Sequence, residues 1–235
     1  MQAPLTLSGP RQETMTTIGF IGSGNIGSTL ARLAVDAGHD VVLSNSRGPE
    51  TLQDLVTRLG PRARAATPVG AAAAGDLVVV TIPIRAYRQV PTEPLRGKVV
   101  IDTLNYDPAR QGSVPEIEAD DTPAHLLLQT HLTGSHVVKA FSNIFFKHLA
   151  ALGRPTGAPD RSALPIAGDD AGARKAVATL IDSLGYDAYD VGPLVESRRF
   201  APGTPAQLAY VNPVGTFAVP GRPASAEDLA KLLAA

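Results

Sequence analysis

The sequence has no cysteine among its 235 residues. This absence excludes disulfide bonds, thiolate metal sites and thiol nucleophiles together. Long apolar runs are missing too, since none approaches the roughly 18 residues that a membrane-spanning helix needs. We therefore expect neither thiol chemistry nor a membrane-embedded segment.

An excess of charge of either sign is also lacking. Lysine and arginine number 21 against 22 aspartates and glutamates, with no basic block and no acidic tail. This balance argues against nucleic acid or a membrane surface as a partner. The apolar fraction of 44% with 18% charged residues is typical of a soluble globular protein.

The first 14 residues lack the features of a secretory signal. They contain an acid and no apolar core, so they do not form a secretory signal. We expect residues 1–14 to be a disordered leader before Met15, and the protein to be cytoplasmic.

Short β-branched runs alternate with helical stretches, which predicts a parallel sheet with crossover helices. The expected strands cover residues 17–21, 39–43, 63–66, 76–82, 99–102, 136–141, 164–167 and 186–190. The expected helices cover residues 26–36, 50–59, 69–74, 122–132, 144–152 and 169–184, and residues 105–113 and 154–161 are expected to be loops.

The composition changes after Gly192, where prolines stand at positions 193, 202, 205, 213 and 220. Because proline removes a backbone donor, we expect no regular packing there, apart from a terminal helix over 226–233. The expected fold class is α/β, a Rossmann-type doubly wound and mostly parallel sheet. Residues 15–192 would form this domain, and residues 193–235 a small irregular or helical C-terminal segment.

A glycine loop, Gly22-Ser23-Gly24-Asn25-Ile26-Gly27, follows the first expected strand. Gly22 permits a tight turn, Gly24 lets the backbone approach a pyrophosphate, and Gly27 lets the following helix pack against the sheet. The phosphates would bind at the N-terminus of that helix. The loop alone is weak evidence, but the strand before it and the unbroken helix after it are the context that a dinucleotide site requires. A tight turn without a ligand is the other interpretation.

The end of the second expected strand indicates which dinucleotide binds. NAD enzymes place an Asp or Glu about twenty residues past the glycines, where it binds the ribose 2′-hydroxyl. Here Ser46 and Arg47 occupy that place, and no carboxylate does. A 2′-phosphate needs donors and positive charge, so the sequence favours NADP(H). A solvated arginine in a turn would give the same pattern.

Three further segments follow strands on the edge of the sheet where ligands bind. Thr81-Ile82-Pro83 either forms an apolar shelf for a nicotinamide ring or merely ends a strand. Asn105-Tyr106-Asp107 either lines a substrate site or forms a turn. Lys139, within the apolar strand VVKAF, either reaches a ligand or extends to solvent.

Other chemistries have little support. The histidines at 39, 125, 131, 136 and 148 lack partners at a metal-ligand spacing, so we expect no metal site. His131 is the least implausible general acid among them. The sequence has neither a G-x-S-x-G elbow nor a phosphate loop with Gly-Lys-Ser/Thr, which argues against serine hydrolases and kinases. No catalytic residue is assigned.

Several motifs occur together in one order: GFIGSGNIGSTLARLAVDAGH, SNSRGPE, DLVVVTIP, KVVIDTLNYDP, VVKAFSNI, LPIAGDD and DVGPLVESRRF. This set resembles the family of F420-dependent NADP oxidoreductases, also called NADPH-dependent F420 reductases. The resemblance spans about residues 17–210.

The resemblance implies hydride transfer between NADP(H) and the deazaflavin coenzyme F420, a small-molecule redox co-substrate, by a homodimer. Carried over by motif, Ser23, Asn25 and Ile26 join the pyrophosphate loop, and Ser46 with Arg47 hold the 2′-phosphate. The implied neighbours of the nicotinamide are Thr81, Ile82, Pro83, Ala140 and Phe141. Hydride transfer between stacked rings depends on alignment and exclusion of water more than on an acid or base.

Two other functions remain open, because the deazaflavin contacts carry no motif and residues 202–223 depart from the more helical end of the founding members. One is an NADPH-dependent reductase of a carbonyl, imine or flavin substrate, which would need a proton donor such as His131, Tyr106 or Lys139. The other is a non-catalytic NADP(H) sensor that switches a partner interaction.

Overall fold

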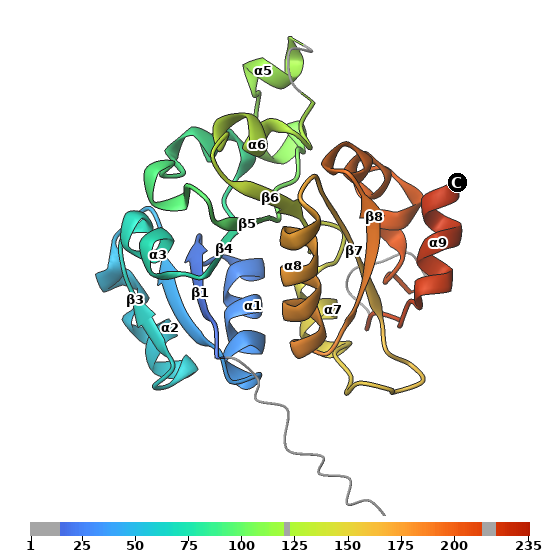
Figure 1. Ribbon diagram of the computed structural model, residues 1–235, viewed down its shortest axis with the longest axis horizontal. Helices are drawn as coiled ribbons and strands as arrows, with labels where there is room; N and C mark the ends of the chain where they lie inside the picture. The colour runs from blue at the N-terminus through green and yellow to red at the C-terminus, as the bar shows by residue number, and fades with distance from the viewer. Residues whose placement is uncertain (1–14, 120–122, 213–219) are drawn as a thin grey trace, which may run out of the picture.

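A computed structural model describes residues 15–119, 123–212 and 220–235, so the leader expected over residues 1–14 lies outside the described residues. Within these ranges the strands form one eight-stranded sheet in the order β3-β2-β1-β4-β5-β6-β7-β8 (Figure 1). Neighbouring strands from β3 to β6 are parallel. Strand β7 is antiparallel to β6 and parallel to β8. The expected Rossmann-type, mostly parallel α/β fold is confirmed.

The strands are β1 (Thr17–Ile21), β2 (Asp40–Ser44), β3 (Ala63–Ala65), β4 (Leu77–Val80), β5 (Val99–Asp102), β6 (His136–Lys139), β7 (Ala163–Gly168) and β8 (Asp187–Gly192). The α-helices are α1 (Asn25–Asp36), α2 (Gln53–Leu59), α3 (Pro68–Ala74), α4 (Pro108–Gln111), α5 (Pro115–Glu118), α6 (Leu127–His131), α7 (Phe146–Ala151), α8 (Ala171–Ser183) and α9 (Ala226–Ala234). The 3-10 helices are η1 (Pro49–Leu52), η2 (Ile84–Gln89), η3 (Glu93–Leu95), η4 (Leu194–Phe200) and η5 (Pro205–Leu208).

Helices cover both faces of the sheet. One apolar cluster joins α1, α7 and α8 to strand residues that include Val79 and Ile101. The other joins α3, η2 and α6 to the alternate residues, such as Val78 and Val100. Side chains of a strand point alternately to the two faces, so all four residues of β4 are buried, as in a central parallel strand. None of the helices in the described ranges is long and apolar enough to cross a bilayer.

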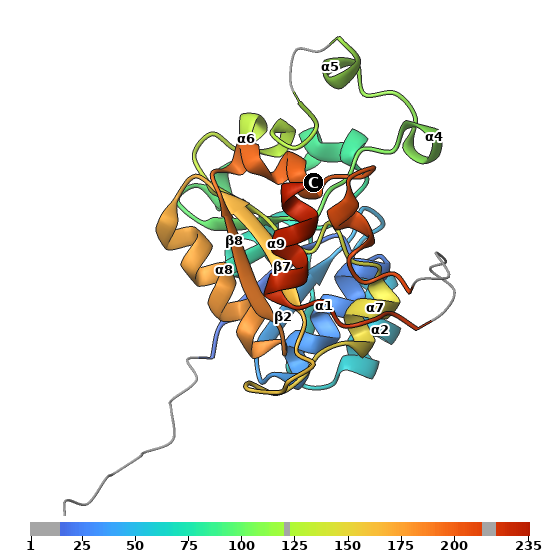
Figure 2. The ribbon, with the colours of Figure 1, turned by 90° about the vertical axis from the view of Figure 1, so that its right-hand side faces the viewer.

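Several elements are shorter than the sequence predicts. The strand expected over 136–141 ends at Lys139, because Phe141 has a positive φ of 58° that interrupts extended pairing. The helix expected over 122–132 is reduced to α6. The loop expected over 105–113 contains the single turn α4, which Pro108 starts with a φ suited to a helix. Figure 2 shows α4 and α5 projecting together from the body of the protein.

The C-terminal segment is more regular than its prolines predict. Pro205 stands at the start of η5, where its missing N–H costs no helical hydrogen bond. η4 packs against β7, and α9 packs against both β7 and η5. Leu194, Phe200 and Tyr210 are buried. The expectation of no regular packing is therefore wrong for 194–208, whereas the terminal helix is present as α9. The division of the chain at residue 192 stays a prediction.

Candidate functional site

The glycine loop connects β1 to α1 at the carboxyl edge of the sheet. Gly22 has a φ of 107°, and a Cβ added there would lie 2.2 Å from the carbonyl oxygen of Thr81. A Cβ on Gly27 would lie 2.5 Å from the carbonyl oxygen of Gly22. Gly24 differs, since a Cβ there would meet no atom within 4 Å. Packing thus requires glycine at 22 and 27, whereas Gly24 leaves an open approach to the backbone.

The N-terminus of α1 has no side-chain cap, because Gly24 stands at the capping position. The free N–H groups of a first helical turn carry the positive end of the helix dipole. The hydroxyls of Ser28 and Thr29 are already used, since they donate to the carbonyls of Gly24 and Asn25 at 2.8 and 2.7 Å. Backbone N–H groups remain as the donors that can meet an anion such as a pyrophosphate.

The turn after β2 is organised by Asn45. Its Oδ1 accepts from the backbone N–H of Arg47 at 2.9 Å, and its Nδ2 donates to Oγ1 of Thr51 at 2.8 Å. Ser46 and Arg47 are exposed, and the Arg47 guanidinium makes no hydrogen bond or ion pair with the part of the chain that the structure describes. The fold therefore presents a free cation on a preformed turn.

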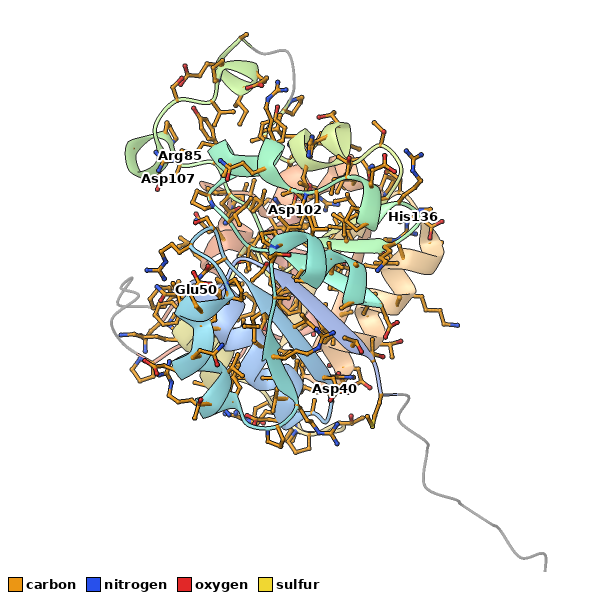
Figure 3. All side chains as sticks on the ribbon, turned by 90° about the vertical axis from the view of Figure 1, so that its left-hand side faces the viewer. Asp40, Glu50, Arg85, Asp102, Asp107 and His136 are labelled. Carbon is orange, nitrogen blue, oxygen red and sulfur yellow. The ribbon has the colours of Figure 1, made fainter. Side chains whose placement is uncertain are left out.

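A carboxylate that the spacing did not indicate lies in the same turn. Glu50 folds back over Gly48, where an added Cβ would lie 2.2 Å from Oε1. Figure 3 shows Glu50 at the surface of the protein. If Arg47 holds a 2′-phosphate, the negative charge of Glu50 in the same turn would oppose its binding.

The end of β4 lies against the glycine loop. The backbone N–H of Thr81 donates to the carbonyl of Ile21 at 2.9 Å. A Cβ on Gly22 would lie 3.0 Å from Cγ2 of Ile82. Thr81 and Ile82 are half-buried and Pro83 is exposed. The structure thus brings the expected apolar shelf to the loop, and its contact with a nicotinamide stays a prediction.

A cleft of about 520 Å³ lies beside the loop. Asn25 and Ile26 line one side, Asn105 comes from the segment after β5, and Phe141 comes from the segment after β6. Asn105 Nδ2 donates to the carbonyl of Ser142 at 2.6 Å, which ties the last two segments together. Among the implied nicotinamide neighbours, Phe141 lines this cleft, whereas Ala140 is fully buried and not part of its wall.

Lys139 does not extend to solvent, so that alternative is wrong. Lys139 is only 4% exposed, and its Nζ lies 3.2 Å from Oδ2 of Asp102. Nζ also donates to the carbonyl of Leu104, whose backbone N–H donates to Asp102 Oδ1 at 2.7 Å. Asp102, labelled in Figure 3, is itself only 1% exposed. This buried pair fixes the chain that leads into Asn105.

Among the histidines, His125 lies next to the cleft, whereas His131, the candidate general acid, does not. His131 Nε2 lies 2.8 Å from the carbonyl oxygen of Val90, and His131 lines a separate pocket with Thr92 and Arg96. His125, by contrast, lines a smaller pocket of about 170 Å³ with Lys139. Across the described residues no group of three or more His, Asp or Glu side chains could hold a metal ion.

Ser197 lines the same pocket as His125 and Lys139. Sequence reasoning gave neither Ser197 nor His125 a role, because no local pattern marks either of them. Burial lowers the pKa of His125, and the positive charges of Lys139 and Arg198 lower it further, so its ring is neutral near pH 7. The pocket adjoins the cleft through Asn105, which lines both.

Residues 17–106 match the family described as NADP oxidoreductase, coenzyme F420-dependent. No curated protein matches the sequence. The chain is similar to hypothetical protein SMa0349 from Sinorhizobium meliloti, with 28% identity over 82% of this chain and 93% of that one, at a TM-score of 0.70. It is also similar to a candidate F420-dependent NADP-reductase from Arthrobacter sp. FB24, with 25% identity over 78% and 87% of the two chains and a TM-score of 0.65.

A reductive aminase from Aspergillus terreus, solved in complex with NADPH, shares the fold at a TM-score of 0.54. It is 18% identical over 77% of this chain and 56% of that one.

Proposed function

We propose that this chain is an NADP-dependent oxidoreductase that transfers a hydride between NADP(H) and coenzyme F420, because residues 17–106 match the family of F420-dependent NADP oxidoreductases. One observation carries the proposal. The uncapped N-terminus of α1, with Asn25 and Ile26, opens onto the same cleft as Asn105 and Phe141. A dinucleotide bound at the loop would therefore have room beside it for a second ring system.

The chain's own residues have binding and positioning roles in this proposal. Backbone N–H groups of the loop from Gly22 to Gly27 hold the pyrophosphate, and Ser46 with Arg47 holds the 2′-phosphate. The nicotinamide is bordered by Thr81, Ile82, Pro83 and Phe141. Ala140 does not contact it and only positions the backbone before Phe141. NADP(H), when bound, supplies or accepts the hydride. The apolar side chains in the cleft wall, such as Ile26, Phe141 and Ile144, align the rings and exclude water.

The proposed activity is tested by mixing the full chain with reduced F420 and NADP⁺. The deazaflavin absorbance should change at a rate proportional to enzyme concentration, and Gly24→Ala should slow this rate at subsaturating NADP⁺. Absence of exchange at high enzyme concentration, with NADP⁺ shown to bind, would contradict F420 as co-substrate.

Cofactor preference is expected to respond in opposite directions to two substitutions in one turn. Arg47→Ala should weaken NADPH binding by about 1.5–3 kcal/mol, the contribution of a charge-assisted hydrogen bond, and leave NADH binding unchanged. Glu50→Gln removes a nearby negative charge and should tighten NADPH about two- to five-fold at low salt. Titration of NADPH and NADH fluorescence gives both dissociation constants. Equal effects on the two cofactors would show that Arg47 does not contact a 2′-phosphate.

The second candidate is NADPH-dependent reduction of a carbonyl, imine or flavin. The position of Lys139 on a pocket next to the cleft favours it, because a lysine is a possible proton donor. In that case Lys139→Met should abolish turnover by the folded enzyme. If the hydride passes between two rings, the folded variant should keep a measurable kcat. A non-catalytic sensor would bind NADPH and NADP⁺ tightly without turnover of either substrate.

We also propose a homodimer, as the family resemblance implies, and a location in the cytoplasm. Sedimentation should then give a species of twice the 24.4 kDa chain mass, and a monomer at all concentrations would contradict the dimer.

A further inference from the structure

The smaller pocket beside the cleft has polar groups deep in its wall. It has a volume of about 170 Å³ and is lined by Leu104, Tyr106, His125, Lys139, Ser197 and Pro202, among others. Lys139 is 4% exposed and Ser197 is 1% exposed. The pocket adjoins the larger cleft at Asn105, which lines both.

Two of these groups have no protein partner. In the described part of the chain, Ser197 Oγ and His125 Nε2 are both buried and neither makes a hydrogen bond. Native proteins satisfy the great majority of such atoms, through the protein, ordered water or a ligand. The two residues come from distant parts of the sequence and meet on the wall of one pocket. Their shared lack of a partner indicates a bound polar group rather than a local packing fault.

Lys139 supplies a third group to the same wall. An ammonium has three N–H donors. One is directed to Asp102 at 3.2 Å and one to the carbonyl of Leu104. The third is left for a ligand. Together with the Ser197 hydroxyl it gives two donors for one acceptor oxygen.

The charges in the pocket select the ligand class. The positive charge of Lys139 is balanced by Asp102, and that of Arg198, which also acts on His125, is balanced by Glu196 at 2.9 Å. Burial keeps the His125 ring neutral. A carboxylate or phosphate would therefore lose its hydration without a net opposite charge to meet it. A neutral carbonyl loses much less, and Leu104 and Pro202 offer its ring apolar contacts.

We propose that this pocket is a subsite for a neutral carbonyl of the lactam or imide class. Its oxygen accepts from Lys139 Nζ and the Ser197 hydroxyl, and its ring N–H meets Nε2 of His125. The inference rests on the proposed function only in that the second substrate would enter through the shared cleft. Lys139 and Ser197 then orient that substrate, and hydride transfer takes place in the larger cleft.

The test is an NMR titration of the full chain with uracil, a small neutral cyclic imide, observed at the ring signals of His125. These signals are identified by their loss in His125→Gln. Uracil should shift them saturably, and Ser197→Ala should weaken uracil about five-fold or more, as expected for one lost hydrogen bond. The exposed hydroxyl of Thr133 provides a control, since Thr133→Ala should leave the uracil affinity unchanged.

Acetate serves as the charged comparison and should not shift the His125 signals. The proposal is overturned if uracil causes no saturable shift, which would mean that the pocket holds solvent only. It is also overturned if Ser197→Ala binds uracil as tightly as the wild type does, or if acetate binds more tightly than uracil. Exchange between F420 and NADP(H) is measured separately, so uracil binding without exchange contradicts the proposed function alone.

Discussion

Gly22→Ala is expected to destabilise the protein by about 3 kcal/mol or more, whereas Gly24→Ala should leave it folded and weaken NADPH binding. Two costs combine at Gly22. Its φ of 107° disfavours any side chain, and the new Cβ would lie 2.2 Å from the carbonyl oxygen of Thr81. That oxygen belongs to the backbone at the end of β4, so it cannot move without disturbing the pairing of β1 with β4.

Gly24 is the matched control, because a Cβ there meets no atom within 4 Å. Its replacement should change the free energy of unfolding by less than about 1 kcal/mol, the range for a capping position. The methyl group would instead occupy the approach of the pyrophosphate and raise the Kd of NADPH about ten-fold or more. Urea unfolding and fluorescence titration measure the two quantities. If Gly24→Ala is as unstable as Gly22→Ala, or binds NADPH as tightly as the wild type does, then Gly22 and Gly24 do not have separate structural and binding roles.

Lys139→Met is expected to cost about 3–5 kcal/mol of stability, because it leaves the carboxylate of Asp102 buried without its cation. The side chains are only 5% and 2% exposed, so water cannot replace the lost partner. The double variant Lys139→Met with Asp102→Asn should recover most of the loss. Asparagine keeps an oxygen that can accept from the backbone N–H of Leu104, and it carries no charge.

The single and double variants form a thermodynamic cycle that is read by urea unfolding. The exposed pair Lys231–Glu227, 2.7 Å apart, is a control in which Lys231→Met should change stability by less than about 1 kcal/mol. Additive losses in the Lys139 and Asp102 variants would mean that the two charges do not interact. A stable Lys139→Met would mean that Asp102 finds another partner or takes up a proton.

Much of the candidate cofactor site follows from local sequence. The glycine loop lies between a β-branched strand and an unbroken helix, and each glycine has a backbone reason that needs only its neighbours. Arg47 is placed by counting from Gly27 along a strand-turn unit of fixed geometry. The parallel order from β3 to β6 follows from alternating strands and helices, because crossover connections allow few other arrangements.

Other features depend on contacts between distant segments. Strand β7 runs antiparallel to β6, and nothing in its apolar sequence sets that direction, since a buried strand satisfies its side chains either way. The helices predicted over 122–132 and 144–152 are longer than α6 and α7, because periodicity does not show where tertiary contacts end a helix. The prolines after Gly192 predict an absence of regular packing, yet Pro205 stands at the start of a helix, where proline is tolerated.

The sequence by itself therefore determined the fold class, the glycine loop and the cation after the second strand, since each depends on residues within one βαβ unit. Only the tertiary structure decided that Lys139 is buried against Asp102, that Glu50 folds back over Gly48, and that His125 and Ser197 share a pocket. Burial and pairing are properties of segments that meet after folding, and no local spacing records them. The open surface at Gly24 and the packed backbone at Gly22 look identical in the sequence, and their surroundings alone separate a binding role from a structural one.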